Sequence, residues 1–180
     1  MKIRGLLPDS VFFILFFLLS LAVSMAGWRV DSLLFLDKEE NMLFSLPMAC
    51  GQRFTTVYIH SVELTPVEDE YMVKDGAIWS WQERVKSSNA GMPFLKPERG
   101  KYIKSGDWMI FQGGRIRWER YHLRVGGERF GRNRLIIEPF GGADLYRVFP
   151  GERLTVTAKS APLLFSRGIG VEKIYPAAGL

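Results

Sequence analysis

The first pattern along the chain is a long apolar run near its start. Residues 11–23 read VFFILFFLLSLAV and contain no charged side chain. Together with residues 24–28, the run approaches the roughly 20 residues that a helix needs to cross a bilayer. Lys2 and Arg4 precede it, and basic residues on this side favour a cytoplasmic N-terminus. The pattern predicts an N-terminal helix within residues 1–28 and an extracytoplasmic domain over residues 29–180.

This N-terminal segment has two possible fates. Ser24-Met25-Ala26 is a small-x-small motif before Gly27, as at the cleavage site of a signal peptide, and cleavage would leave a periplasmic protein. Retention would give a single-pass anchor in the inner (cytoplasmic) membrane, with Trp28 at the interface. We favour retention, because the phenylalanine-rich run is strongly apolar and the cleavage motif is a loose match.

Beyond the apolar run, the alternation of polar and apolar residues indicates β-strands. Arg53–Ser61 alternates with a period of two, which places Phe54, Thr56, Tyr58 and His60 on one face. An Asp-Gly pair at residues 75–76 is typical of a tight turn and predicts a hairpin over residues 71–85. We expect further strands at Leu43–Leu46, Trp108–Gln112, Tyr121–Val125, Leu135–Glu138 and Leu154–Ala158, turns at the glycine pairs 113–114, 126–127 and 141–142, and a loop over residues 87–104.

These elements predict the fold class. Several short strands with no helical period after the N-terminal segment favour a single all-β domain, built as an antiparallel β-sandwich or a small barrel. The 180 residues leave room for one such domain plus the N-terminal helix. Cys50 is the only cysteine, which excludes an internal disulfide, and we expect its thiol to be buried or half-buried.

Charge changes this picture only modestly. The formal net charge is +5, which is mild for a nucleic-acid binder. Arginines nevertheless gather over residues 115–134, and this stretch is either a solvated sheet face with a polar loop or a contact surface for anionic headgroups or an acidic partner. The candidates for such a surface are Arg115, Arg117, Arg124 and Arg134.

The densest group of chemically versatile side chains lies at residues 60–70. This string holds one imidazole, two hydroxyls and four carboxylates. Its structural interpretation is a hydrogen-bonded His60 at a strand end, a turn shaped by Thr65-Pro66, and mostly solvated carboxylates at residues 68–70. Its functional interpretation is a ligand or partner contact formed by His60, Ser61, Glu63, Thr65, Glu68 and Glu70.

Metal binding and nucleophilic catalysis find little support in this string. His122 is the only other histidine and no cysteine pair exists, so we expect no metal site and no cofactor. Ser61 follows His60 directly, and neighbours on a strand point to opposite faces. We therefore expect no catalytic set.

A second candidate contact is the loop over residues 88–93, which reads SNAGMP. Its small residues let the backbone approach a ligand and expose N–H donors. The loop is either an ordinary connection or a contact formed by Asn89, Gly91 and Pro93.

These two strings, in this order, resemble an uncharacterised bacterial family, domain of unknown function number eighteen-fifty. The family pattern Y-x-HSV-x-x-TPV-x-E is similar to YIHSVELTPVE at residues 58–68, with the family glutamate at Glu68 or Glu70. Its GAGLP loop is similar to residues 89–93, with Asn89 in place of glycine and Met92 in place of leucine. The resemblance extends from about Met42 to Ala158.

The resemblance implies genes beside those of the fused membrane component and the substrate-binding protein of TAXI-type tripartite (TRAP) transporters. It also implies a short N-terminal membrane segment, and no enzymatic activity is established for the family. Our leading hypothesis is a non-enzymatic accessory or binding protein that contacts the transporter's membrane subunit or its solute-binding protein. The alternative is a small extracytoplasmic hydrolase that uses His60 with Glu63 or Glu68.

Overall fold

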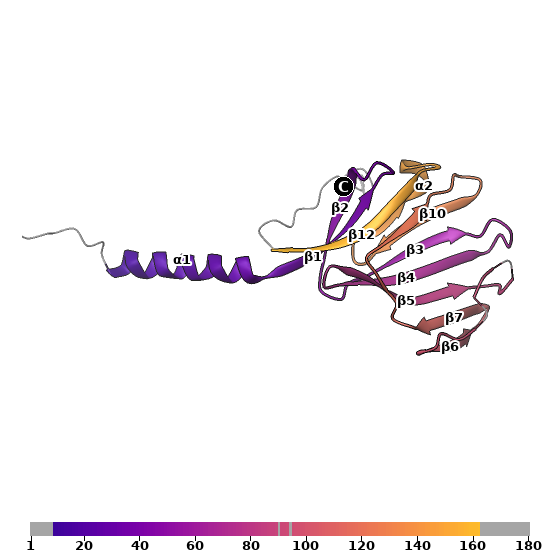
Figure 1. Ribbon diagram of the computed structural model, residues 1–180, viewed down its shortest axis with the longest axis horizontal. Helices are drawn as coiled ribbons and strands as arrows, with labels where there is room; N and C mark the ends of the chain where they lie inside the picture. The colour runs from indigo at the N-terminus through magenta and orange to yellow at the C-terminus, as the bar shows by residue number, and fades with distance from the viewer. Residues whose placement is uncertain (1–8, 90, 94, 163–180) are drawn as a thin grey trace, which may run out of the picture.

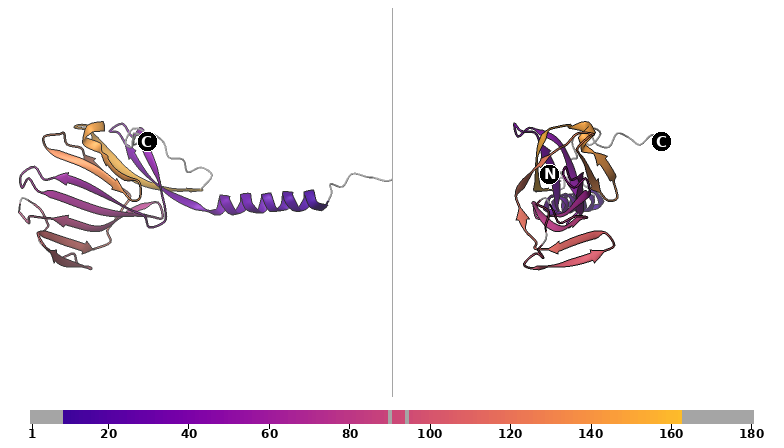
Figure 2. Two further views of the ribbon diagram at one scale, coloured as in Figure 1. Left: turned by 180° about the vertical axis from the view of Figure 1, so that it is seen from behind. Right: turned by 90° about the vertical axis from the view of Figure 1, so that its right-hand side faces the viewer.

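A long helix precedes the β-strands. The computed structural model describes residues 9–89, 91–93 and 95–162, and helix α1 spans Asp9–Gly27. The helix projects away from the strands as a separate rod (Figure 1), and Figure 2 shows the same projection from behind. Its apolar side chains are solvent-exposed, with Phe13 at 69% and Phe17 at 66%. The predicted N-terminal helix is thus present.

In the described part of the chain, no helix has the length and apolar character that a membrane crossing requires. Lys2 and Arg4, which we used to orient the segment, lie outside the described residues.

The strands form two antiparallel sheets. The smaller sheet has the order β2-β1-β12-β9, and the larger has the order β11-β10-β3-β4-β5-β7-β6, with β8 also paired to β5. The strands are β1 Arg29–Leu36, β2 Met42–Met48, β3 Arg53–Ile59, β4 Pro66–Lys74, β5 Ala77–Val85, β6 Gly100–Ser105, β7 Trp108–Gly113, β8 Arg117–Trp118, β9 Arg120–Arg124, β10 Gly131–Ile137, β11 Gly141–Asp144 and β12 Arg153–Pro162, and a short helix α2 spans Leu145–Val148.

The two sheets share one hydrophobic core. Phe35 of β1 and Phe44 of β2 stack at 4.3 Å between ring centroids, and Phe54 and Leu135 reach the same core from the larger sheet. Each strand order among the described residues ends in open edges, so the all-β antiparallel prediction is confirmed and the small-barrel alternative is wrong. A second apolar cluster of Val67, Val85, Met92 and Phe111 lies on the part of the larger sheet around β4, β5 and β7.

The hairpin over residues 71–85 is confirmed. Its two strands, β4 and β5, meet at Asp75 and Gly76, whose φ angles of +54° and +66° suit the twist of a two-residue hairpin turn. The buried carboxylate of Asp31 on β1 accepts hydrogen bonds from the N–H groups of Asp75, at 3.0 Å, and Gly76, at 2.9 Å. This contact fastens the tip of the hairpin to the smaller sheet.

Four details depart from the prediction. Residues 100–105 form strand β6, where we expected a loop. The sequence did not reveal this edge strand, because it is largely exposed and lacks apolar alternation. Gly141 and Gly142 belong to β11, where a Cβ on Gly142 would lie 3.2 Å from Arg134. Strand β1, Arg29–Leu36, precedes the first strand that we expected, at Leu43–Leu46. Cys50 is exposed in the turn after β2, so the expectation of a buried thiol is wrong.

Candidate functional site

The first predicted string forms a closed turn at the end of β3. The N–H of His60 donates to the carbonyl of Thr65, and the N–H of Leu64 donates to the carbonyl of His60, both at 2.9 Å. The Nδ1 atom of His60 accepts the N–H of Glu63 at 3.1 Å and that of Val62 at 3.4 Å. An imidazole nitrogen that accepts hydrogen bonds carries no proton, so the proton of this ring lies on Nε2. The histidine is hydrogen-bonded at the strand end, as its structural interpretation predicted.

A short chain of hydrogen bonds joins this turn to the second predicted string. The carboxylate of Glu63 accepts the hydroxyl of Ser87 at 2.8 Å, and that hydroxyl accepts the N–H of Asn89 at 3.2 Å. The carbonyl of Asn89 accepts the N–H of Met92 at 3.1 Å, and the Met92 side chain is buried against Val67, Val85 and Phe111. The structure therefore brings the two strings together, apart from Ala90, which lies outside the described residues.

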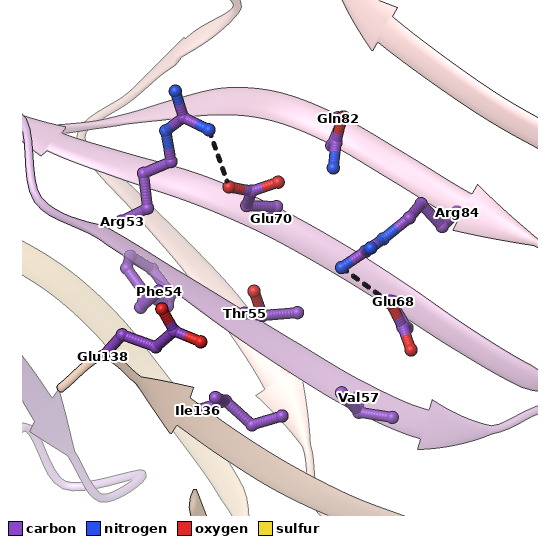
Figure 3. A pocket seen from close by; sticks show the side chains of 10 residues that line it. All are labelled: Arg53, Phe54, Thr55, Val57, Glu68, Glu70, Gln82, Arg84, Ile136 and Glu138. Atoms are coloured by element: carbon purple, nitrogen blue, oxygen red, sulfur yellow. Dashed lines mark hydrogen bonds and ion pairs between the residues drawn. The ribbon is translucent and has the colours of Figure 1, made fainter. Parts of the chain in front are cut away.

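Glu68 and Glu70 lie elsewhere, on the side of β4 that faces away from the smaller sheet. Glu68 pairs with Arg84 at 2.8 Å and Glu70 pairs with Arg53 at 3.1 Å. Their side chains are only 23% and 13% exposed, so the expectation of solvated glutamates is wrong. Both ion pairs border a cavity of about 550 Å³ that Figure 3 shows, which also has Gln82 and Glu138 in its lining.

An aromatic side chain extends this charged surface. The guanidinium carbons of Arg53 and Arg115 lie 3.9 Å and 3.4 Å from the ring centroid of Trp81. The Nε atom of Arg84 is withdrawn from solvent and has no hydrogen-bond partner among the described residues. We call this surface the outer face, and its members are Arg53, Glu68, Glu70, Trp81, Arg84 and Arg115.

The four arginines of the predicted anionic contact each have different neighbours. Arg115 stacks on Trp81, Arg117 pairs with Glu119 at 3.2 Å, and Arg134 pairs with Asp144 at 2.8 Å. Arg124 on β9 lies opposite Arg153 on β12 in the smaller sheet.

The contacts give the hydrolase alternative no support. Glu63 is engaged by Ser87 and Glu68 by Arg84, so each proposed carboxylate partner of His60 has another neighbour. The Nδ1 atom of His60 is occupied by backbone donors. Among the described residues, no group of three or more His, Cys, Asp or Glu side chains could hold a metal ion.

Sequence reasoning missed a cluster on the opposite side of the larger sheet. Asp69 on β4 lies directly opposite Glu83 on β5. Burial, together with the nearby charge of Glu83, raises the pKa of Asp69 to about 7, and burial also raises the pKa of Glu83. Burial and these two carboxyl groups raise the pKa values of Tyr58 and Tyr71 as well. Alternation along β4 could have revealed this position, since Glu68 and Glu70 on one side require Asp69 on the other.

Comparison with known proteins supports the family resemblance. Residues 54–139 match the model of the family described as "Domain of unknown function (DUF1850)". The match begins in β3 and ends just after β10, so it contains both loop strings and every member of the outer face except Arg53. No curated protein and no solved structure matches the chain.

Proposed function

With residues 54–139 in this family of domains, we propose that the chain is a non-enzymatic accessory protein that binds a partner protein through its outer face. The proposed partner is the membrane subunit or the solute-binding protein of a TAXI-type TRAP transporter. The observation that carries the proposal is the outer face itself, where two ion pairs border one open cavity and Arg53, which belongs to one of these pairs, also stacks on Trp81.

The composition of the outer face suits a protein contact. Tryptophan and arginine are the residues that most often dominate the binding energy of protein interfaces. The guanidinium groups of Arg53 and Arg115 stack on the Trp81 ring and restrict its movement. The Trp81 side chain therefore loses little conformational entropy on binding. A carboxylate or carbonyl of the partner would supply the acceptor that the Nε of Arg84 lacks.

The proposal places the β-domain beyond the cytoplasmic membrane. The side chains of α1 from Phe12 to Leu19 are all more than half exposed, and the helix has no apolar surface of the β-domain to cover it. Exposed apolar area of this size is unfavourable in water, at about 25 cal/mol per Å². A role as an export segment that is cleaved after Ala26 would remove this apolar surface from the mature chain.

The partner contact is tested by affinity purification of the tagged full-length chain from membranes in mild detergent, with mass spectrometry of the co-purified proteins. The informative variant is the charge swap E68R/R84E, which keeps an ion pair but reverses its direction across the outer face. K38E is the matched control, because Lys38 is 72% exposed in the turn between β1 and β2.

We expect the unaltered chain and K38E to recover a TRAP component and the charge swap to lose it, while all three proteins melt at similar temperatures. Unchanged recovery with the swap would remove the outer face from the contact. Recovery of no transporter component by the unaltered chain would contradict the proposed partner.

Export is tested separately with a C-terminal tag. Protease added to spheroplasts should remove the tag, and the intact mass of the purified chain should show whether residues 1–26 remain. A tag that stays protected until the cells are lysed would contradict an extracytoplasmic position.

A further inference from the structure

A second cavity lies on the other side of the larger sheet, between that sheet and β9. Its volume is about 260 Å³ and it is lined by residues of both sheets, among them Thr56, Tyr58, Asp69, Tyr71, Tyr121 and Arg124. The outer face does not share these residues, because they occupy the alternate positions of β3 and β4. We call this space the inner cavity.

Two acidic side chains in and beside the inner cavity form no ion pair with any described residue, although Arg124 also lines the cavity. The carboxyl groups of Asp69 and Glu83 face each other across neighbouring strands, and neither forms an ion pair within the described parts of the chain. Burial and mutual repulsion are the causes that raise the pKa of Asp69 to about 7. A buried carboxylate is favourable only when a cation or hydrogen-bond donors compensate it.

A hydroxyl group in the same place also lacks a partner. The Tyr121 hydroxyl is fully withdrawn from solvent and makes no hydrogen bond to any described residue. The Tyr121 ring is fixed by stacking on Tyr71, with 5.1 Å between centroids, and Tyr71 stacks in turn on Phe54 at 5.2 Å. Buried polar groups of native proteins are almost always hydrogen-bonded, so this oxygen points to an absent donor or acceptor.

We propose that the inner cavity binds a small primary ammonium ion, which donates hydrogen bonds to the carboxylate of Asp69 and the hydroxyl oxygen of Tyr121. The ring of Tyr58, which also lines the cavity, supplies apolar contact for the carbon chain and an attractive face for the cation. A metal ion fits less well, because the described residues place no three carboxylate, imidazole or thiolate groups together. Arg124 in the lining disfavours a second positive charge on the ligand.

The test is isothermal titration calorimetry of the full-length chain in mild detergent with three probes of similar size. We expect saturable binding of n-butylammonium and none of 1-butanol or butyrate. Asp69→Asn should weaken butylammonium binding at least about tenfold, since it removes the charge and keeps the shape. Tyr121→Phe should weaken it several-fold. Glu39→Gln, in the exposed turn between β1 and β2, should leave it unchanged.

A pH series separates specific binding from general attraction. The titratable and charged groups around Asp69 are Glu83 on β5, Tyr58 on β3, Tyr71 on β4, and Tyr121, His122 and Arg124 on β9. Because the ligand requires ionised Asp69, affinity should rise between about pH 6 and about pH 8, and Asp69→Asn should abolish this rise.

Three results would overturn the proposal. Equal binding of 1-butanol would mean that the cavity selects apolar volume alone. No saturable heat with butylammonium would mean that the cavity holds only water. Unchanged affinity in Asp69→Asn, with the variant folded by circular dichroism, would place any bound amine elsewhere.

Discussion

A single buried carboxylate connects the two sheets at the tip of the central hairpin. Asp31 belongs to β1 of the smaller sheet, yet both of its oxygens accept N–H groups from the β4–β5 turn of the larger sheet. A Cβ on Gly76 would come within 3.1 Å of the Ser160 nitrogen, so the turn and β12 also lie close together. Asp31 therefore has a structural role, which the sequence does not reveal because its hydrogen-bond partners lie more than 40 residues away in the chain.

Asp31→Ala should therefore destabilise the domain. It leaves two backbone N–H groups at the turn without their acceptor, and we expect the free energy of unfolding to fall by about 2 kcal/mol. Urea denaturation followed by tryptophan fluorescence measures this loss. Glu39→Ala, at an exposed turn position, is the control and should change stability by less than about 0.5 kcal/mol. A similarly small effect at Asp31 would contradict the assigned role.

Asp69 should make the stability of the domain depend on pH. Its pKa is raised from 3.8 to about 7 on folding, so the folded state holds the proton more tightly than the unfolded state. Asp69 therefore stabilises the folded state at pH values below its unfolded pKa of 3.8. As the pH rises from there towards 7, this contribution is lost and the free energy of unfolding falls by up to about 4 kcal/mol. The neighbouring Glu83 acts in the same direction, because burial also raises its pKa.

Asp69→Asn should flatten this dependence. The free energy of unfolding of the variant should fall less than that of the unaltered chain between about pH 4 and about pH 7. Denaturation at several pH values measures both slopes. Parallel slopes for the two proteins would show that Asp69 titrates normally in the folded state.

At the scale of elements, the turn between β9 and β10 depends on a close approach of backbone to backbone. The N–H of Gly126 donates to the buried side-chain oxygen of Asn133 at 2.6 Å. A Cβ on Gly126 would collide with the carbonyl oxygen of Phe130 and lie 2.8 Å from the Cα of Gly131. The neighbouring Gly127 has no atom within 4 Å of such a Cβ.

These two adjacent glycines give a matched pair of substitutions. Gly126→Ala should lower the free energy of unfolding by about 2 kcal/mol or more, because the backbone on both sides has to shift. Gly127→Ala should be nearly neutral. Thermal melts of the two variants measure this difference. Equal melting temperatures would contradict the close contact between Gly126 and the backbone of residues 130–131.

Sequence predicts elements well where local chemistry decides them. The Asp-Gly turn and its flanking alternation predict β4 and β5, and the strands β2, β3, β7, β9, β10 and β12 lie where the pattern places them. Edge strands are harder: β6 is exposed at most positions and β11 begins with two glycines, so their pairing partners decide their structure. Asp69 escaped notice because we read it with its acidic neighbours in sequence, which lie on the opposite side of the sheet.

At the scale of the whole molecule, α1 and the β-domain are structurally separate. The helix extends away from the sheets, and its apolar side chains do not join the core (Figure 1). The core that holds the two sheets together comes from the strands, from Val125 just after β9 and from Leu145 of α2.

A chain that begins at Trp28 should consequently melt at the same temperature as the full-length chain, within about 2 °C. It should also need no detergent to stay in solution, since the exposed apolar helix is gone. Differential scanning fluorimetry and size-exclusion chromatography test the two statements. A clear drop in melting temperature would show that α1 stabilises the sheets.

The join between helix and sheet has a mechanical consequence. Only Trp28 separates α1 from β1, and β1 pairs with β12 over eight residue pairs on one side and with β2 on the other. A pull on α1 along the strand direction would therefore load the hydrogen bonds of two ladders at once, in shear, instead of peeling them apart one by one. The domain is built so that force arriving from its N-terminal end meets the middle of a sheet.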